Sequence, residues 1–326
     1  MRTAITTIGI AVALGGVLPA VSAQPVTPGR RAHHALVYDE ARQLILLTAG
    51  STPVNGGQSF TFFNDLWAFD GSGWRPLGES GERLSGIRLA YDAPRHRVTS
   101  FGGYNGRSMG ELRALEGEQW RILGRLAEML VAEPGFVFDL GRNRFVAFGG
   151  SSGPGRPAGD TWEYDGTSWT RLAPAGPPPR QAHVMVFDER RGRTLVFGGM
   201  GAGASGQPPP SLDDTWEFDG RTWVRREVSG PSARHSAGVA YDSKRGLVIL
   251  FGGLGNDGFL GDTWSWDGTK WTRLAETGPE PRGMGYLAYD KRRDRVVLFG
   301  GRKGYPDGDL NDTWEWDGTR WQRVGN

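Results

Sequence analysis

The sequence predicts an all-β protein, a six-bladed β-propeller with four antiparallel strands in each blade. Two periodic features predict this fold. A tryptophan follows a glycine turn in each of six modules, at Trp74, Trp120, Trp169, Trp223, Trp271 and Trp321. In each module an aspartate also stands eleven positions before a glycine, at Asp39, Asp92, Asp139, Asp188, Asp242 and Asp290. A strict repeat of about 40 to 50 residues, built from short strands and glycine turns, is typical of a propeller or solenoid.

The fifth module shows the strand pattern expected of one blade. Its apolar residues predict strand A over 235–241, strand B over 247–251, strand C over 263–266 and strand D from Trp271. In every module the A-B link carries an aspartate and an arginine three positions apart, and the C-D link carries an acid followed by glycine. The aspartate satisfies backbone N–H groups and the glycine supplies a positive φ. We therefore expect both links to be tight structural turns.

The tryptophans are expected to pack between blades. One four-stranded sheet cannot bury its faces alone, but six sheets around an axis bury both faces of each. All 13 tryptophans fall at repeat positions, which favours inter-blade packing over a ligand platform. The predicted blades span about 30–77, 83–123, 125–172, 180–226, 231–274 and 279–324.

The N-terminus and the composition limit the classes of function. Residues 1–23 are typical of a secretory signal, with basic Arg2, an apolar run from Ile8 to Leu18 and small residues before Gln24. We expect a mature chain of residues 24–326, secreted or periplasmic, without a later membrane span. Lys and Arg total 38 against 36 Asp and Glu, so nucleic acid and anionic membranes are not expected partners. The absence of cysteine excludes disulfides, thiolate metal sites and cysteine nucleophiles.

The modules resemble the kelch repeat. The resemblance rests on a glycine pair after a β-branched strand, an aromatic residue on strand C and a tryptophan on strand D, and it covers about residues 30–324. It implies a six-bladed kelch propeller, here of a secreted bacterial type. The first module departs from it with Thr48-Ala49-Gly50, and the second has Arg113 where the others have tryptophan. These two blades are expected to be the less symmetric ones.

One face of the ring is expected to bind. The A-B and C-D turns lie on one face, whereas the B-C loops and D-A connections lie on the other. From the last glycine of the pair to the strand-C aromatic position, the spacing varies from 10 to 17 positions. A rigid scaffold with unequal loops on one side is typical of a binding surface. Its aromatic candidates are Phe60, Phe259 and Tyr305, although Phe62 and Phe63 are equally consistent with inward packing at the start of strand C.

Arginines recur at the start of strand A on the same face. Eight positions before the turn aspartate lie Arg31, Arg180, Arg234 and Arg282, while Arg83 is displaced by one in blade two and blade three has none. A partial ring of guanidinium groups would bind a carboxylate bidentately. This resembles kelch adaptors that read acidic peptides and kelch-type sialate mutarotases. The alternative is that each arginine pairs with an acid or with backbone of an adjacent blade.

Histidines are the remaining candidates for chemistry. His33, His34, His183 and His235 lie on strand A near the axis, and we take His34, His183 and His235 as possible ligand contacts. Without cysteine the Cys-Tyr cofactor of kelch-containing galactose oxidase is absent. The run Asp307-x-Asp309-x-Asn311 lacks the glycine and glutamate of a calcium loop. We expect no metal and no cofactor.

The leading functional hypothesis is a non-catalytic binding module that holds an anionic or hydroxyl-rich ligand, a glycan or a protein segment, on the B-C face. The second is a carbohydrate-active enzyme such as an epimerase or mutarotase. It would use Arg234 or Arg282 to hold a carboxylate and His183 or His235 as the base.

Overall fold

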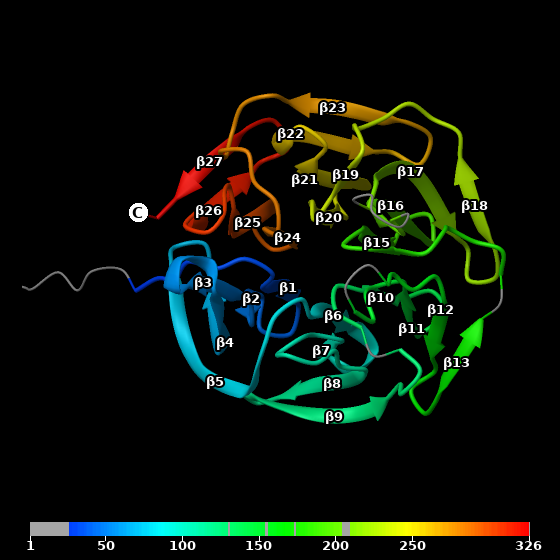
Figure 1. Ribbon diagram of the computed structural model, residues 1–326, viewed down its shortest axis with the longest axis horizontal. Coiled ribbons are helices and arrows are strands. Elements are labelled where there is room, and N and C mark those ends of the chain that lie inside the picture. Colours follow the sequence, from blue (N-terminus) through cyan, green and yellow to red (C-terminus); the bar gives the residue numbers. More distant parts are fainter. Residues whose placement is uncertain (1–25, 130, 154–155, 173, 204–208, 326) are drawn as a thin grey trace, which may run out of the picture.

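The computed structural model describes residues 26–129, 131–153, 156–172, 174–203 and 209–325, so the predicted signal at 1–23 lies outside it. Six antiparallel sheets stand around a central axis, with strand A of each sheet innermost and strand D outermost (Figure 1). This confirms the predicted all-β six-bladed propeller. Among the described residues, no helix is both long and apolar enough to pass through a bilayer.

The first three blades occupy one half of the ring. Blade one comprises β1 (Ala35–Asp39), β2 (Leu44–Thr48), β3 (Ser51–Val54), the short helix η1 (Asn55–Gly57), β4 (Ser59–Phe69) and β5 (Trp74–Leu84). Blade two comprises β6 (Arg88–Asp92), the short helix η2 (Ala93–Arg95), β7 (Arg97–Phe101), β8 (Glu111–Glu116) and β9 (Gln119–Arg125). Blade three comprises β10 (Gly135–Asp139), β11 (Arg144–Phe148), β12 (Thr161–Tyr164) and β13 (Trp169–Leu172).

The last three blades complete the ring. Blade four comprises β14 (Arg180–Gln181), β15 (Val184–Asp188), β16 (Arg193–Gly201), β17 (Ser211–Phe218) and β18 (Trp223–Arg226). Blade five comprises β19 (Arg234–His235), β20 (Gly238–Asp242), β21 (Leu247–Gly255), β22 (Gly258–Trp266) and β23 (Trp271–Ala275). Blade six comprises β24 (Tyr286–Asp290), β25 (Arg295–Arg302), β26 (Asp309–Trp316) and β27 (Trp321–Val324).

Each blade is built from consecutive strands, and the ring closes without strand exchange. At the junction between blades six and one, Arg31 N–H donates to the Leu310 carbonyl at 3.1 Å. Arg282 N–H donates to Leu260 in the same way at 2.9 Å, between blades six and five. The closing junction therefore uses the same contacts as an internal one.

The tryptophans of strand D pack between blades, as predicted. Their rings lie 5.0 to 5.3 Å, between centroids, from a strand-B phenylalanine of the preceding blade in the pairs Trp74–Phe299, Trp169–Phe101, Trp223–Phe148, Trp271–Phe197 and Trp321–Phe251. In four of these pairs the indole N–H also donates to a buried threonine of that blade, for example Trp271 to Thr215 at 3.0 Å. Trp169 has no such partner, because blade two has Leu112 at the threonine position.

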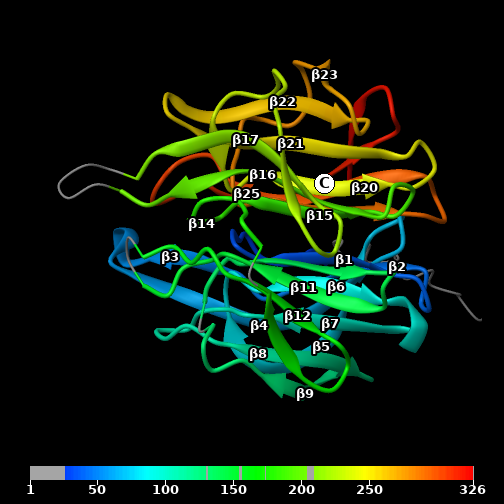
Figure 2. The same ribbon diagram turned by 90° about the vertical axis from the view of Figure 1, so that its right-hand side faces the viewer.

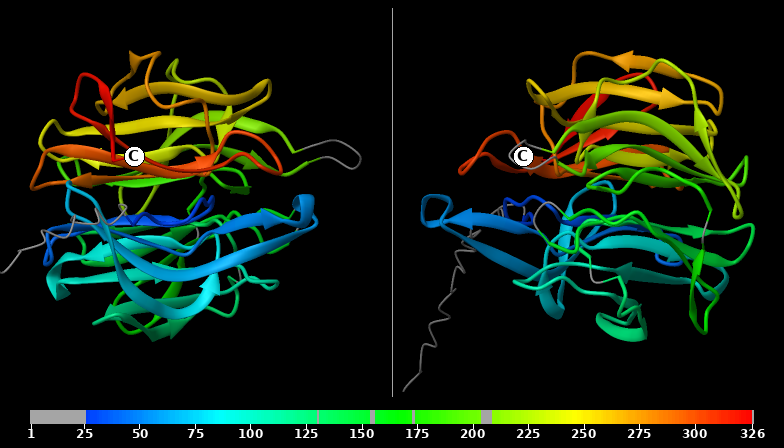
Figure 3. Two further views of the ribbon diagram at one scale, coloured as in Figure 1. Left: turned by 90° about the vertical axis from the view of Figure 1, so that its left-hand side faces the viewer. Right: turned by 45° about the vertical axis from the view of Figure 1, so that its right-hand side comes forward.

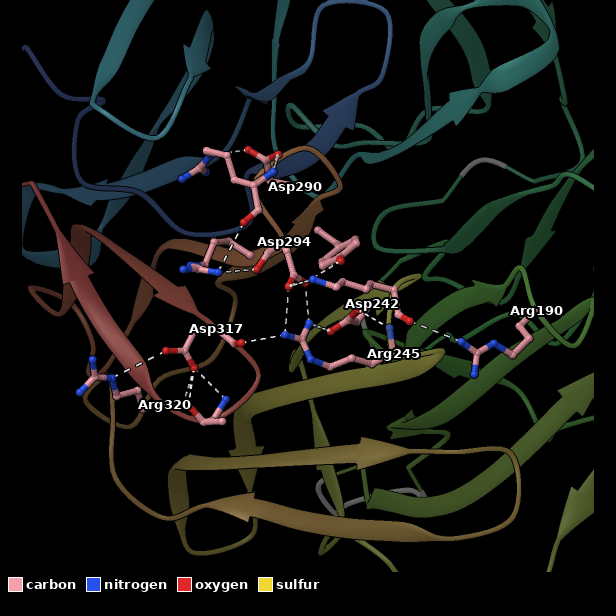
Figure 4. A network of polar contacts seen from close by, with 12 residues as sticks. Arg190, Asp242, Arg245, Asp290, Asp294, Asp317 and Arg320 are labelled. Atoms are coloured by element: carbon pink, nitrogen blue, oxygen red, sulfur yellow. Dashed lines mark hydrogen bonds and ion pairs between the residues drawn. The ribbon is translucent and has the colours of Figure 1, made fainter.

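The A-B turn arginines also join adjacent blades. Arg245 donates to Asp242 of its own turn at 2.7 Å, and then to Asp294 and to the Asp317 carbonyl of blade six (Figure 4). Arg42 reaches the Gly117 carbonyl of blade two in the same manner, and Arg293 lies against Gly71 of blade one. The face formed by these turns is thus held together by contacts that recur from blade to blade.

Candidate functional site

A closed ring of backbone hydrogen bonds surrounds the axis. Two residues after the arginine position, one residue of each blade donates its N–H to the equivalent carbonyl of the preceding blade, over 2.7 to 3.4 Å. The six residues are His33, Gly86, Glu133, Ala182, Ser236 and Met284, and all have a positive φ between 52° and 66°. Non-glycine residues adopt this conformation only where the surroundings impose it. The ring divides the axial space into two compartments.

A pocket of about 350 Å³ lies on the B-C side of this ring. Blades one to three supply most of its lining, and blades four and six add Gln181 and Arg302. The β3–β4 hairpin of blade one, which supplies Phe60 and Phe62 to the lining, projects from this face of the ring (Figures 2 and 3). Phe60, Phe62 and Tyr104 give it an aromatic wall, and four serines give it hydroxyl groups: Ser51, Ser85, Ser108 and Ser151.

The floor of the pocket carries an ion pair between two blades. His33 Nδ1 lies 2.5 Å from Glu133 Oε1, and both side chains are about one-fifth exposed. Burial alone would raise the pKa of Glu133, but the charge and hydrogen bond of His33, with help from Arg88, lower the pKa to about 2. Glu133 is therefore an anion at any physiological pH. No role was predicted for Glu133 from the sequence.

The four arginines in register are buried and paired within their own blades. Each is at most 1% exposed and binds one aspartate through both terminal nitrogens, in the pairs Arg31–Asp65, Arg180–Asp214, Arg234–Asp262 and Arg282–Asp312. Each also donates to a carbonyl at the end of strand B, and the same aspartate accepts from a strand-C tryptophan. This corrects the expected guanidinium ring at the channel mouth, because these donors are already used by the protein.

Blades two and three lack this arrangement. Leu84 and Val131 replace the arginine, and both are buried. In blade two Arg113 occupies the tryptophan position and pairs with Glu111 on the same strand. The displaced Arg83 is an exposed residue that donates to the Phe62 carbonyl at 3.3 Å. The two blades that break the arginine pattern are thus also blades that line the pocket.

The predicted histidines do not converge. His34 is fully buried between the rings of Tyr286 and Phe299, and burial holds its pKa well below the ordinary value. His183 packs on Phe148, and burial lowers the pKa of His183 likewise. His235 is half-buried and lies 3.0 Å from the Ser236 hydroxyl. With Arg234 and Arg282 also paired, the residues assigned to the enzymatic alternative form no common site.

The predicted aromatic contacts fall in three different places. Phe60 is 42% exposed and lines the pocket. Tyr305 is 60% exposed, but its hydroxyl donates to the Gly57 carbonyl and so joins the loops of blades six and one. Phe259 is half-buried on β22 beside Gly283 and is not among the pocket residues.

Sequence reasoning missed Tyr104 and the pocket serines. They lie between strands B and C or just before strand A, where these residue types are ordinary, so no sequence signal distinguished them. The described residues contain no cluster of three or more His, Asp or Glu side chains suited to a metal ion. Asp309, from the calcium-like run, is buried and pairs with Arg302 at 2.6 Å.

Two comparisons with known proteins bear on this geometry. The profile of a family described as the KLHDC2/KLHL20/DRC7 Kelch-repeats domain matches residues 135–325, more than half of the chain. A search of curated proteins finds no match.

Proposed function

Because the chain belongs to the kelch-repeat family, whose propellers typically mediate protein–protein interactions, we propose that it binds a segment of a partner protein in the B-C pocket. The observation that carries this proposal is the pocket itself. It lies where the loops of blades one, two and three meet, and it combines an aromatic wall with hydroxyl groups and the His33–Glu133 pair.

The lining defines the chemistry of the partner segment. Phe62 and Tyr104 lie 6.3 Å apart between ring centroids and, with Phe60, offer a surface for an apolar or aromatic side chain. The side-chain amide oxygen Oε1 of Gln181 has no hydrogen-bond partner among the described residues. Together with the serine hydroxyls, it suits backbone amides and hydroxyl groups of a ligand. The basic side chains in the described lining, His33 and Arg302, are already bonded to Glu133 and Asp309 and offer no unpaired cation to a carboxylate. We therefore infer a polar, uncharged segment with an apolar anchor, in place of an acidic one.

A peptide selection tests this proposal. Peptides are selected from a random library on the mature chain, and their affinities are measured for wild type and for Phe60→Ala and Tyr104→Ala. We expect at least a tenfold loss of affinity for each variant, because anchors in a well-packed pocket dominate such interfaces. Leu140→Ala is the matched control, since Leu140 is 44% exposed on the opposite face.

Two outcomes would contradict the proposal. One is selected peptides that bind both pocket variants as tightly as wild type. The other is a glycan array, run in parallel, in which a glycan binds wild type and loses affinity with Tyr104→Ala while no peptide does. Acidic peptides that bind wild type and Glu133→Gln with equal affinity would contradict the inferred uncharged segment and favour an anionic ligand.

The location of the partner is part of the proposal. The apolar run and the small residues within 1–23 support export, and hence a partner outside the cytoplasm. N-terminal sequencing of the protein from its native host tests this, with Gln24 as the expected first residue. A chain that retains Met1 in the cytoplasmic fraction would contradict it.

A further inference from the structure

The axial compartment on the other side of the hydrogen-bonded ring is a separate cavity of about 290 Å³. It opens toward the A-B turns. At its mouth the Lys291 ammonium of blade six lies 2.6 Å from Glu40 of blade one and 3.1 Å from Glu189 of blade four. All three side chains are about one-third exposed. The mouth is therefore bridged by flexible, solvated side chains and not by packed backbone.

Arg88 is a cation in this cavity without a carboxylate partner. Its Nη1 donates to the Ile87 carbonyl at 3.2 Å and to the Tyr286 hydroxyl at 2.9 Å, while the guanidinium carbon lies 4.9 Å from the Tyr286 ring centroid. Among the described residues, no acid lies within ion-pair distance, and no acceptor meets Nε or Nη2. Glu133 contributes charge from beyond the ring, but its carboxylate is held by His33. By contrast, the four in-register arginines each bind an aspartate.

The wall around the half-buried Arg88 side chain is largely apolar. Leu36, Leu89 and Met185 line the cavity, together with small residues at the level of Arg88, such as Ala35 and Gly135. A charge in an apolar environment is unfavourable unless it is paired and hydrogen-bonded. An anion of suitable size would give Arg88 the ionic partner that the described residues do not supply.

Two further polar side chains, Tyr286 and His183, are part of the cavity lining. The Tyr286 hydroxyl accepts from Arg88, so its own proton is free to donate. His183 lines the cavity, is 3% exposed, and has no hydrogen-bond partner for either ring nitrogen among the described residues. A methyl group placed on Gly135 would come within 2.5 Å of His183 Nε2, so this nitrogen is packed against the Gly135 backbone.

We propose that this cavity binds a small organic carboxylate with an apolar body. The carboxylate accepts from Nε and Nη2 of Arg88 and from the Tyr286 hydroxyl, and the body fills the apolar space toward the mouth. Lys291 must swing aside for entry, while Glu40 and Glu189 remain in solvent. The site is independent of the partner segment proposed for the B-C pocket.

Fluorine NMR with para-fluorobenzoate tests the proposal. We expect saturable binding to the mature chain, at least tenfold weaker binding of the neutral para-fluorobenzamide, and at least a tenfold loss for Arg88→Met. Arg88→Lys keeps the charge but loses the planar fork, so an intermediate loss is expected. Lys291→Ala is expected to speed exchange of the probe with little change in affinity.

Two control variants distinguish this cavity from the B-C pocket and from binding at the protein surface. Tyr104→Ala lies in the opposite compartment and should bind the probe as wild type does, whatever its effect on peptides. Arg225→Met removes an exposed arginine and should also have no effect. If Arg88→Met does not fold, Tyr286→Phe and the amide comparison decide the question. The proposal is overturned if wild type shows no saturation, if the amide binds equally well, or if the Arg88 variants retain full affinity.

Discussion

Blades four to six and blades two and three use the same strand pattern but treat polar groups differently. In blades four to six, one aspartate of strand C accepts hydrogen bonds from the arginine of strand A and from the tryptophan of strand C, all within the same blade. In blades two and three, Leu84 and Val131 replace the arginine. The indole N–H of Trp162 in blade three has no hydrogen-bond partner among the described residues.

This difference separates structural roles from recognition. A repeat position that keeps its residue type forms a closed set of contacts and leaves little for a ligand. Where the pattern breaks, apolar groups seal the core, and nearby positions carry the side chains of the pocket, such as Ser85, Tyr104 and Glu133. Four predictions test how far the regular and irregular blades differ.

The largest effect is expected from the buried ion pair of a regular blade. Burial would raise the pKa of Asp262, but hydrogen bonds from Arg234 and Trp264 hold the pKa below its ordinary value. Arg234→Met leaves this charge without its partner, so we expect a loss of about 3 kcal/mol or more in the free energy of unfolding in urea. Arg83→Met, in an irregular blade, should change it by less than about 0.5 kcal/mol. Equal losses of unfolding free energy for the two variants would show that the regular and irregular blades do not differ in this respect.

A smaller effect is expected at the C-D turns. Gly268 has φ +100°, and a methyl group there would meet Arg191 Nε at 2.6 Å, whereas at Gly117 of blade two (φ +65°) no atom lies within 4 Å. Gly268→Ala should therefore cost about 2 to 3 kcal/mol and Gly117→Ala about 1 kcal/mol, the cost of the backbone conformation alone. Thermal unfolding of both variants measures the difference. A larger loss for Gly117→Ala would show that the arginine contact is unimportant.

The tryptophan hydrogen bond comes next. Thr215→Val removes the acceptor of the Trp271 N–H at a buried interface, and we expect a loss of about 1 to 2 kcal/mol. A double-mutant cycle with Trp271→Phe isolates the bond, because the valine substitution should cost much less when no N–H is left unpaired. Trp169→Phe is the counterpart in blade three, where no such bond exists. Additive losses in the cycle would contradict the assignment.

The smallest effect is expected from the ion pair on the ring. The pKa of Glu133 is lowered in the folded state to about 2 from 4.5, so its contribution to stability is present above pH 4.5 and is lost as the pH falls toward 2. Between pH 5 and pH 2, wild type should lose about 1 kcal/mol more than Glu133→Gln, as measured by urea unfolding at each pH. Glu227→Gln, at an exposed pair, should follow wild type. Parallel pH curves for wild type and Glu133→Gln would show that the pair contributes nothing.

The strand pattern was predictable in its spacing but not in its details. For the fifth module, strand A was expected over 235–241, whereas the structure interrupts it at Ser236, between β19 and β20. The interruption is the positive φ of the hydrogen-bonded ring. Its six residues are of six different types, because contacts with the preceding blade impose the conformation and the side chain does not. No local sequence signal marks such a position.

By itself, the sequence determined the number of blades, the strand order, the turns and the packing role of the tryptophans. These features depend on periodicity and on neighbouring residues, and each module repeats them. Only the tertiary structure decided which polar groups are free. The aspartates that neutralise the arginines lie 28 to 34 residues away, and His33 and Glu133 lie 100 residues apart, so burial and pairing emerge only when the blades come together around the axis.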